Sequence, residues 1–466
     1  MPRIRMLTVL ALFAILIGLA PTSDATQPRR RRRPPQNTEA NANPADESAT
    51  EKETESDDEE EEARYLVIEG GVLHPGSGAP LEGMTIVCRN GKIEKIGPNP
   101  SYPEDAEVID ASGRHVYPGL IAVRSSRILG GNPENDTDVF DLSMSLALAA
   151  GITTAVTGDT AAKLTFGTLD DMILKRNLFE NIRYSSRDPD GKRKLRASLE
   201  RVRQYLRDLD AWEDEKRDNP DAPEPDKEWL KGEYEKHLRL LKGEATGFTN
   251  ARDQHDLLQI CELAEDYGIR MVVDGAHEGW IVAPELARSG VSVIMSPRDR
   301  VDPNRDLLRD SGSTIENAAR LHDHGVRLAI IPAGSYFGSG EGISLGGLAG
   351  RDLAHLSMEA AFAVRGGLSN DDAIKAITID AARVLGIDHR VGSIEEGKDA
   401  DFVIADGDLL HYMTLAQMTI VNGRVAYDKS KESIYSHIRP SNPDEPEPSD
   451  YWPRRLNADW VEPVDR

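Results

Sequence analysis

Short runs of alternating apolar and polar residues occur near both ends of the chain and predict β-strands there. On the N-terminal side they read RYLVIEGGVLHPGSG, MTIVCRNGKIEKIGP and AEVIDASGRHVYPG, and on the C-terminal side GSIEEGKDADFVIAD and MTIVNGRVAYD. Asn90-Gly91 and Asn422-Gly423 separate apolar runs, which predicts hairpins because a type I′ turn needs positive φ at both central residues. We therefore expect one small composite β-sandwich made from residues 64–118 and 391–430.

The middle of the chain repeats a different unit, in which a helical pattern, a glycine and a nearly continuous apolar run follow one another. ICELAEDYGIRMVVDG, PELARSGVSVIMSP and AARLHDHGVRLAIIPAG place Gly268, Gly290 and Gly325 where a helix C-cap needs left-handed geometry. LAAGITTAVTGD, at residues 148–159, is an earlier copy. Such apolar runs are typical of strands buried on both faces of a sheet. The repeat predicts the α/β class, as a parallel sheet or a (β/α)8 TIM-type barrel, and the length available favours a barrel over residues 119–390.

One stretch interrupts this repeat. Residues 175–243 are highly charged and helical in pattern, with a break at NPDAPEPD. They predict a helical insertion on the outside of the barrel. A solvated helical bundle is the favoured interpretation, and a binding lid is the alternative.

The first 25 residues have the pattern of a secretory signal peptide. Arg3 and Arg5 precede the apolar run LTVLALFAILIGLA, and small residues lead to a plausible cleavage site after Ala25. The run is shorter than the roughly 20 residues that span a bilayer, so an uncleaved membrane anchor is the less favoured alternative. We expect an exported protein, periplasmic or extracellular, without a stable membrane span.

Residues 26–63 contain five consecutive arginines and then an acidic run, with few apolar residues, and they predict a disordered charged linker. Residues 431–466 are assigned to a C-terminal tail. The net charge of −24 argues against nucleic acid as a partner, because phosphate binding needs a basic surface. Cys88 and Cys261 fall in different predicted domains, so we expect two buried free thiols rather than a disulfide.

Four stretches of the sequence carry a resemblance to a known family. They are GGVLHPGSGAPLEGMTIVCRNGKIEKIGP, VIDASGRHVYPGLI, AGITTAV and AITIDAARVLGIDHRVGSIEEGKDADFVIADGD, and together they extend over most of residues 64–430. They resemble the amidohydrolase superfamily, in the branch of imidazolonepropionase-like proteins. The resemblance implies a barrel flanked by a composite β-sandwich, and metal-dependent hydrolysis of non-peptide C–N bonds in amides or cyclic amides.

The resemblance also implies zinc or another divalent metal, held by histidines and carboxylates at the ends of several barrel strands. An Asp-x-His-x-His is expected directly after Pro-Gly-Leu-Ile, with further ligands after the fifth, sixth and eighth strands. The residues at these positions are Ala122, Arg124 and Ser126 after the first strand, Asn250 and Asp274 after the fifth and sixth, and Ala333 after the eighth. A guanidinium stays protonated and cannot ligate a metal. We therefore expect neither a metal nor another cofactor.

Asp274 and His277 are the candidate catalytic residues. They follow a strand of the buried type, where a barrel places its chemistry, and a carboxylate can orient an imidazole for acid–base catalysis. The candidate ligand-binding residues lie at the same mouth and are Arg124, Ser126, Arg127 and Asn250. Guanidinium groups bind anions through forked donors. The alternative is that Arg124 pairs with Asp274 as a structural ion pair in place of a metal.

Two functions therefore remain open. The favoured one is an exported, degenerate and metal-free relative of hydrolases that act on non-peptide C–N bonds. The alternative is a non-catalytic protein that binds a small anionic molecule, or a subunit of an active paralogue. Proteins of this family commonly dimerise, so we expect a homo- or hetero-oligomer.

Overall fold

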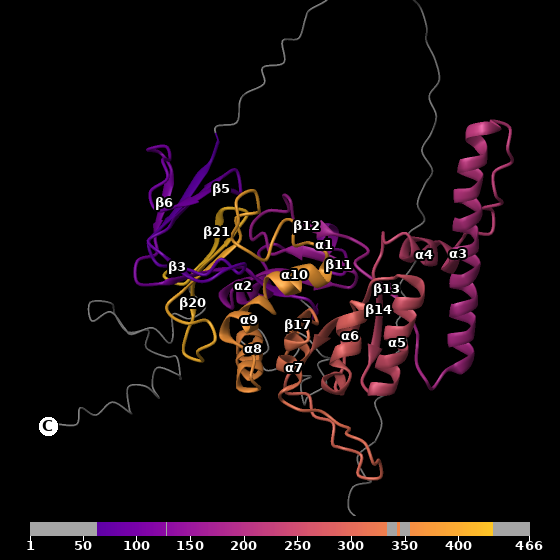
Figure 1. The fold of residues 1–466 in the computed structure, drawn as a ribbon. Helices are drawn as coiled ribbons and strands as arrows, with labels where there is room; N and C mark the ends of the chain where they lie inside the picture. The colour runs from indigo at the N-terminus through magenta and orange to yellow at the C-terminus, as the bar shows by residue number, and fades with distance from the viewer. Residues whose placement is uncertain (1–62, 127, 333–342, 345–354, 432–466) are drawn as a thin grey trace, which may run out of the picture. The chain divides into compact units, whose positions relative to one another are not determined.

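The computed structural model describes residues 63–126, 128–332, 343–344 and 355–431, drawn as a ribbon in Figure 1. The chain divides into two units, residues 1–60 and 61–466, and every helix and strand given below belongs to the second. The expected signal peptide, almost all of the expected linker and tail, Arg127 and Ala333 lie outside the described residues. No helix in the described ranges is long and apolar enough to cross a membrane.

Strands from both ends of the chain share one β-rich part, in which Figure 1 shows the indigo and yellow strands together. One sheet has the order β5-β4-β1-β6, and a second has the order β21-β20-β19-β7-β2-β3. The strands are β1 (Tyr65–Glu69), β2 (Val72–Leu73), β3 (Leu81–Glu82), β4 (Thr85–Arg89), β5 (Lys92–Gly97), β6 (Glu107–Asp110), β7 (His115–Pro118), β19 (Phe402–Ala405), β20 (Ala416–Val421) and β21 (Arg424–Asp428). β19 pairs with β7, and Phe402 packs in one core with Leu66 and Ile86. The strands from the two sides of the barrel sequence therefore form the composite sandwich expected from the sequence.

The two predicted Asn-Gly turns have the expected backbone conformation and lie against each other. Asn90 and Gly91 have φ of 50° and 80°, and Asn422 and Gly423 have φ of 51° and 61°. A Cβ atom on Gly91 would lie 2.9 Å from the carbonyl oxygen of Asn422, so a side chain at Gly91 would push the turns apart. Turn chemistry therefore joins the N-terminal and C-terminal halves of the sandwich.

The α/β part contains parallel strands in two arcs, β8-β10 and β13-β14-β15-β16-β17. Their bounds, with those of the antiparallel strands β11 and β12 and of the short pair β9 and β18, are β8 (Leu120–Ala122), β9 (Ser125–Ser126), β10 (Ile152–Thr157), β11 (Thr160–Lys163), β12 (Ile173–Lys175), β13 (Glu180–Asn181), β14 (Gly247–Ala251), β15 (Met271–Gly275), β16 (Ser292–Met295), β17 (Leu328–Ile330) and β18 (Ile343–Ser344). Backbone hydrogen bonds link the arcs: Leu178 N donates to Asp159 O, and residues 376–377 accept from Ile330 N and Ile121 N. This is the predicted α/β fold of the (β/α)8 TIM-barrel type.

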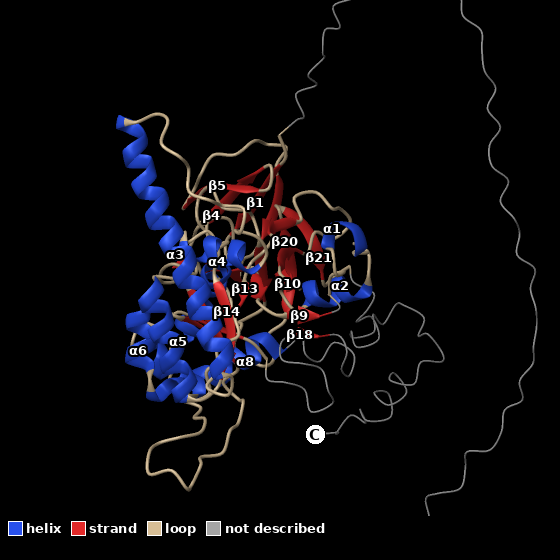
Figure 2. Ribbon diagram, turned by 90° about the vertical axis from the view of Figure 1, so that its right-hand side faces the viewer, coloured by secondary structure: helices blue, strands red, loops and turns tan. Residues whose placement is uncertain are grey.

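Helices cover the outer face of these strands, and Figure 2 shows α5 and α6 alongside β14. They are α1 (Pro133–Asp136), α2 (Leu142–Ala149), α3 (Pro189–Asp218), α4 (Glu233–Leu241), α5 (Gln254–Tyr267), the 3-10 helix η1 (Gly279–Ile281), α6 (Ala283–Ser289), α7 (Asn317–Asp323), α8 (His355–Arg365), α9 (Asn370–Lys375) and α10 (Ile379–Leu385). Gly268 and Gly290 end α5 and α6 in the left-handed conformation, as predicted. The two cysteines are buried and free, which confirms that prediction.

The barrel strands are buried on both faces. Val272 and Ile294 lie in the interior cluster, whereas Val273 and Val293 pack in the outer cluster with the helices. This alternation accounts for the nearly continuous apolar runs in the sequence, because each face of a strand meets a different apolar layer.

The charged stretch 175–243 is helical only in part. It contains α3 and α4, which pack against each other, but β12 ends at residue 175 and β13 adds to the edge of the sheet beside β14. α3 buries Leu199, Val202 and Tyr205, and Arg203 donates a hydrogen bond to the carbonyl oxygen of Asp266 at the end of α5. The helical part thus packs on the outer layer of the barrel.

A buried ionic cluster joins the barrel to the sandwich. The side chain of Lys163, at the end of β11, is fully buried, and its Nζ lies 2.7 Å from Asp399 Oδ2 and 3.1 Å from Asp401 Oδ2. Burial opposes ionisation of Asp399, but Lys163 and Lys92 outweigh it and hold the pKa of Asp399 below its usual range. Burial raises the pKa of Asp401 in spite of Lys163.

We expect Lys163→Met to reduce the free energy of unfolding by about 3–5 kcal/mol, because it leaves two buried carboxylates without their shared cation. Lys92→Met is the matched control, since Lys92 pairs with the same Asp399 at 2.8 Å but keeps 58% of its side chain exposed. It should cost less than about 1 kcal/mol. Urea unfolding followed by circular dichroism measures both, and equal losses would contradict the assignment of Lys163 as the central cation.

Candidate active site at the barrel mouth

Asp274 lies at the carboxyl end of β15 and points into the barrel. Asn250 on β14 and Ile294 on β16 are its neighbours in parallel register. Val272, two residues earlier, belongs to the interior cluster, and residues i and i+2 of a strand point to the same face. The chain then leaves the strand through Gly275, at φ 105°. The mouth therefore has a carboxylate where the apolar interior ends.

Arg124 forms an ion pair with Asp274, in which its Nη1 donates to Asp274 Oδ2. The side chain of Arg124 is 37% exposed and that of Asp274 is 3% exposed. Ser125 holds the segment in place because its Oγ donates to the carbonyl oxygen of Val156 at 2.7 Å. The sequence left this pair as the alternative to anion binding by Arg124, and the structure contains it.

The donor atoms at this level do not fit a divalent metal. The interior beside and below Asp274 is closed by buried apolar side chains, which are Ile121, Val123, Val156, Val272 and Ile294. The Asp274 carboxylate is bound by a guanidinium, which has no lone pair for a metal. Among the described residues, no three His, Cys, Asp or Glu side chains are grouped so as to hold a metal ion.

His277 has a different partner from the one the sequence indicated. Its side chain is buried, and Nε2 lies 3.4 Å from Asp299 Oδ2. Nδ1 is buried and has no hydrogen-bond partner in the described part of the chain. The two residues of the predicted acid–base pair thus have separate partners, since Asp274 pairs with Arg124 and His277 contacts Asp299. Asp299 could have been found only by its place shortly after the strand that ends at Met295.

Glu278 holds the loop that carries His277. Its carboxylate accepts hydrogen bonds from Gln254 N at 2.9 Å and from Gly312 N at 2.8 Å. These bonds tie the loop after β15 to the first turn of α5 and to the loop before α7. The position of His277 is therefore fixed by backbone contacts on two sides.

A second buried carboxylate near the strand ends was also missed by the sequence. Glu359 on α8 is fully buried, accepts from Ser296 Oγ at 3.0 Å and pairs with Arg298 at 2.6 Å. Arg298 also lies over the ring of Phe362, 4.7 Å from its centroid. The available signal was a single acidic residue within the apolar pattern of residues 355–365. The cluster fixes the loop after β16.

The remaining predicted binding residues are accessible. Ser126 and Asn250 are exposed, and Asn250 is the register neighbour of Asp274. Arg127 lies outside the described residues. The structure therefore brings Arg124, Asn250 and Asp274 to one level of the mouth, with a buried carboxylate below and accessible donors above.

Comparison with known proteins relates this chain to the amidohydrolase family. The model of the amidohydrolase family matches residues 231–438, which include Asn250 and Asp274 but begin after Arg124. A 5-methylthioadenosine/S-adenosylhomocysteine deaminase of Symbiobacterium thermophilum is 39% identical over 72 residues, and an imidazolonepropionase of Picrophilus torridus is 45% identical over 62 residues. Each match covers 12% of this chain and 16% of the relative, so the alignment includes only a small part of either protein.

A solved structure has the same fold over most of the chain. An amidohydrolase from Thermotoga maritima superposes with a TM-score of 0.56 at 21% identity, and the match covers 78% of this chain and all of that one (100%). At this identity the likeness concerns the fold. It agrees with the barrel and composite sandwich described above.

We expect Arg124→Met to lower the free energy of unfolding by about 2–3 kcal/mol, because Asp274 keeps its burial and loses its cation. This is less than for a fully buried pair, since Arg124 is partly hydrated. The double variant Arg124→Met/Asp274→Asn should be more stable than Arg124→Met alone in urea unfolding. Arg288→Met, which removes an exposed pair with Glu265, should change stability by less than about 1 kcal/mol. A similarly small change for Arg124→Met would contradict the pair.

Proposed function

Because this chain is a member of the amidohydrolase superfamily, we propose that it retains the barrel of that superfamily and binds a small anionic molecule at the barrel mouth without metal-dependent hydrolysis. The observation that carries the proposal is the Arg124–Asp274 ion pair. It occupies the place at which the family resemblance expects metal ligands.

Metal-dependent hydrolysis needs a Lewis acid that lowers the pKa of a bound water, and therefore an open ligand set of nitrogen and carboxylate donors. At this mouth the Asp274 carboxylate pairs with the guanidinium of Arg124, and the layer of side chains below Asp274 is apolar. The side chain of His277 contacts Asp299 and does not form one catalytic pair with Asp274. These contacts favour a binding role over hydrolysis.

The accessible donors favour an anion as the ligand. Arg124 is partly exposed, and its guanidinium carries N–H donors in a planar fork that matches a carboxylate or phosphate. Asn250 and Ser126 add an amide and a hydroxyl on the open side. A carboxylate or phosphate group would receive charge-assisted hydrogen bonds from this set.

Export and assembly complete the proposal. The N-terminal signal pattern supports export to the periplasm or the extracellular space.

The names of the matched relatives, a deaminase and an imidazolonepropionase, describe enzymes that act on C–N bonds. An active paralogue with intact ligands is therefore a suitable partner for this chain as a non-catalytic subunit.

Elemental analysis tests the absence of a metal centre. The full chain, expressed with zinc, iron and manganese in the medium, should retain less than about a tenth of a metal ion per chain, and its melting temperature should be unchanged by a chelator. A stoichiometric metal that stabilises the protein and is removed by the chelator would refute the metal-free proposal.

Titration calorimetry with succinate and with inorganic phosphate tests the anion site. Arg124→Gln should weaken binding of the preferred anion about tenfold or more, because a charged hydrogen bond contributes roughly 1.5–3 kcal/mol. Arg288→Gln, an exposed substitution on α6, should leave the affinity unchanged. Absence of binding by both anions, or equal affinity in Arg124→Gln and the parent protein, would reject the mouth as an anion site.

A further inference from the structure

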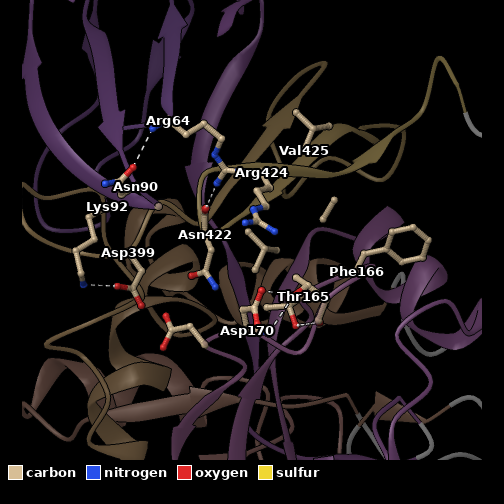
Figure 3. Close-up of a pocket in the computed structure, with 15 residues that line it drawn as sticks. Arg64, Asn90, Lys92, Thr165, Phe166, Asp170, Asp399, Asn422, Arg424 and Val425 are labelled. Atoms are coloured by element: carbon tan, nitrogen blue, oxygen red, sulfur yellow. Dashed lines mark hydrogen bonds and ion pairs between the residues drawn. The ribbon is translucent and has the colours of Figure 1, made fainter. Parts of the chain in front are cut away.

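A cavity lies at the junction of the sandwich and the barrel, at the end of the barrel opposite to the mouth (Figure 3). β11 runs antiparallel to β10, with Lys163 opposite Thr154, so the loop after β11 lies at the amino ends of the parallel strands. The cavity has a volume of about 530 Å³, within the roughly 300–1,000 Å³ typical of ligand pockets. It is therefore large enough for a small organic molecule.

Two walls of different origin form this cavity. The sandwich contributes Arg64 together with Asn90, Gly91 and Asn422 of the two turns, and the barrel contributes residues of the loop 165–171. Close packing of Gly91 against Asn422 keeps the sandwich wall in place. The cavity thus exists because the N-terminal and C-terminal strands of the sandwich meet beside the barrel.

The carboxylates of the cavity are already paired within the protein. Asp399 contacts Lys163, Lys92 and Arg390 at 2.7–2.8 Å. Asp171 pairs with Arg390, and Asp170 accepts a hydrogen bond from Thr168 Oγ1 at 2.7 Å. Asp399 and Asp171 are therefore balanced by cations of the protein itself, whereas the partner of Asp170 is a neutral hydroxyl.

The two guanidinium groups of the cavity, those of Arg64 and Arg424, are not balanced in this way by a carboxylate among the described residues. The guanidinium of Arg64 donates a hydrogen bond to a neutral group, the carbonyl oxygen of Asn422, at 3.1 Å. Arg424 is exposed and makes no ion pair with a carboxylate in the described part of the chain. Burial and the positive charge of Arg424 lower the pKa of Arg64, with Glu107 acting in the opposite direction. The two cations repel each other, and an anion between them would remove that repulsion.

A further donor and an apolar surface adjoin the two arginines. Asn422 Oδ1 accepts a hydrogen bond from Lys163 Nζ at 2.5 Å, which leaves the amide nitrogen of Asn422 as a donor toward a ligand. Phe166, 38% exposed, lines the cavity with Val425, and Phe140 supports the Phe166 ring edge-to-face at 5.6 Å. Donors and an apolar surface therefore occur in the same cavity.

We propose that this cavity is a second ligand site, which binds a small organic anion with an apolar or aromatic body. Arg64 and Arg424 bind its carboxylate or phosphate group through charge-assisted hydrogen bonds. Phe166 contacts its body. The site is independent of the barrel mouth and of whether the mouth binds an anion.

Titration calorimetry of the full chain with phenyl phosphate, benzoate and inorganic phosphate tests the proposal. Phenyl phosphate or benzoate should bind more tightly than inorganic phosphate, and the stronger of the two identifies the acidic group. Arg424→Gln should weaken that binding about tenfold, because it removes a charged donor at an exposed position that does not support the core. Phe166→Ala should reduce the preference over inorganic phosphate.

Two control variants separate this site from general charge effects and from the mouth. Arg89→Gln changes an exposed arginine of the same sandwich that does not line the cavity, and Arg124→Gln changes the mouth. Arg89→Gln should leave the binding of the preferred probe unchanged, and in Arg124→Gln the binding event that Arg424→Gln weakens should persist. Lack of saturable binding by either aromatic probe at millimolar concentration would overturn the proposal, as would equal losses in Arg89→Gln and Arg424→Gln. A loss found only in Arg124→Gln would assign the probe to the mouth and also reject this site.

Discussion

The burial of the Lys163 ammonium group is the constraint on which the arrangement of this protein depends. A cation removed from water costs several kcal/mol, so it is tolerated only where carboxylates and a carbonyl surround it. Asp399, Asp401 and Asn422 meet this need from the C-terminal part of the chain. The carbonyl oxygen of Asp401 also accepts from Gly119 N at 3.0 Å, and there the chain enters β8. A Cβ atom on Gly119 would lie 2.0 Å from Thr153 Oγ1, so only glycine lets β8 approach β10 this closely. The ionic cluster thereby positions β8, from which the chain continues to Arg124.

Polar chemistry in this barrel is confined to its two ends. At the mouth, Arg124 and Asp274 lie above a floor of apolar side chains that includes Val272 and Ile294. At the amino ends of the strands, Lys163 and its partners lie beside the sandwich. A cluster of buried apolar side chains, which includes Ile121 and Ala329, lies between the two ends. The charges at one end therefore do not neutralise those at the other, and each end must balance its own.

Features set by neighbouring residues were predictable from the sequence, and features set by distant partners were not. Both Asn-Gly turns and the glycine C-caps at Gly268 and Gly290 follow from backbone preferences of a few residues. The Arg124–Asp274 pair was accessible because the family resemblance placed both residues at one mouth. Lys163 and Asp401 are separated by 238 residues, and no local pattern relates them. The contacts of His277 with Asp299 and of Glu359 with Arg298 were not predicted for the same reason. The two-residue strand β13 was missed because its pairing with β14 comes from tertiary structure, while its surroundings are charged and read as helical.

The composite sheet has a consequence for the order in which the chain acquires its structure during synthesis. β7 is made early, but its partner β19 and the two strands beyond it are made only after the whole barrel. Domains usually fold as units with the N-terminal one first, and pairing between distant segments slows folding. Here the sandwich begins first and finishes last, and until then the nascent chain exposes the edge of β7 and leaves Lys163 in water. Barrel and sandwich therefore cannot mature as two successive domains, because the sandwich is complete only when the C-terminal strands are available to pair with β7.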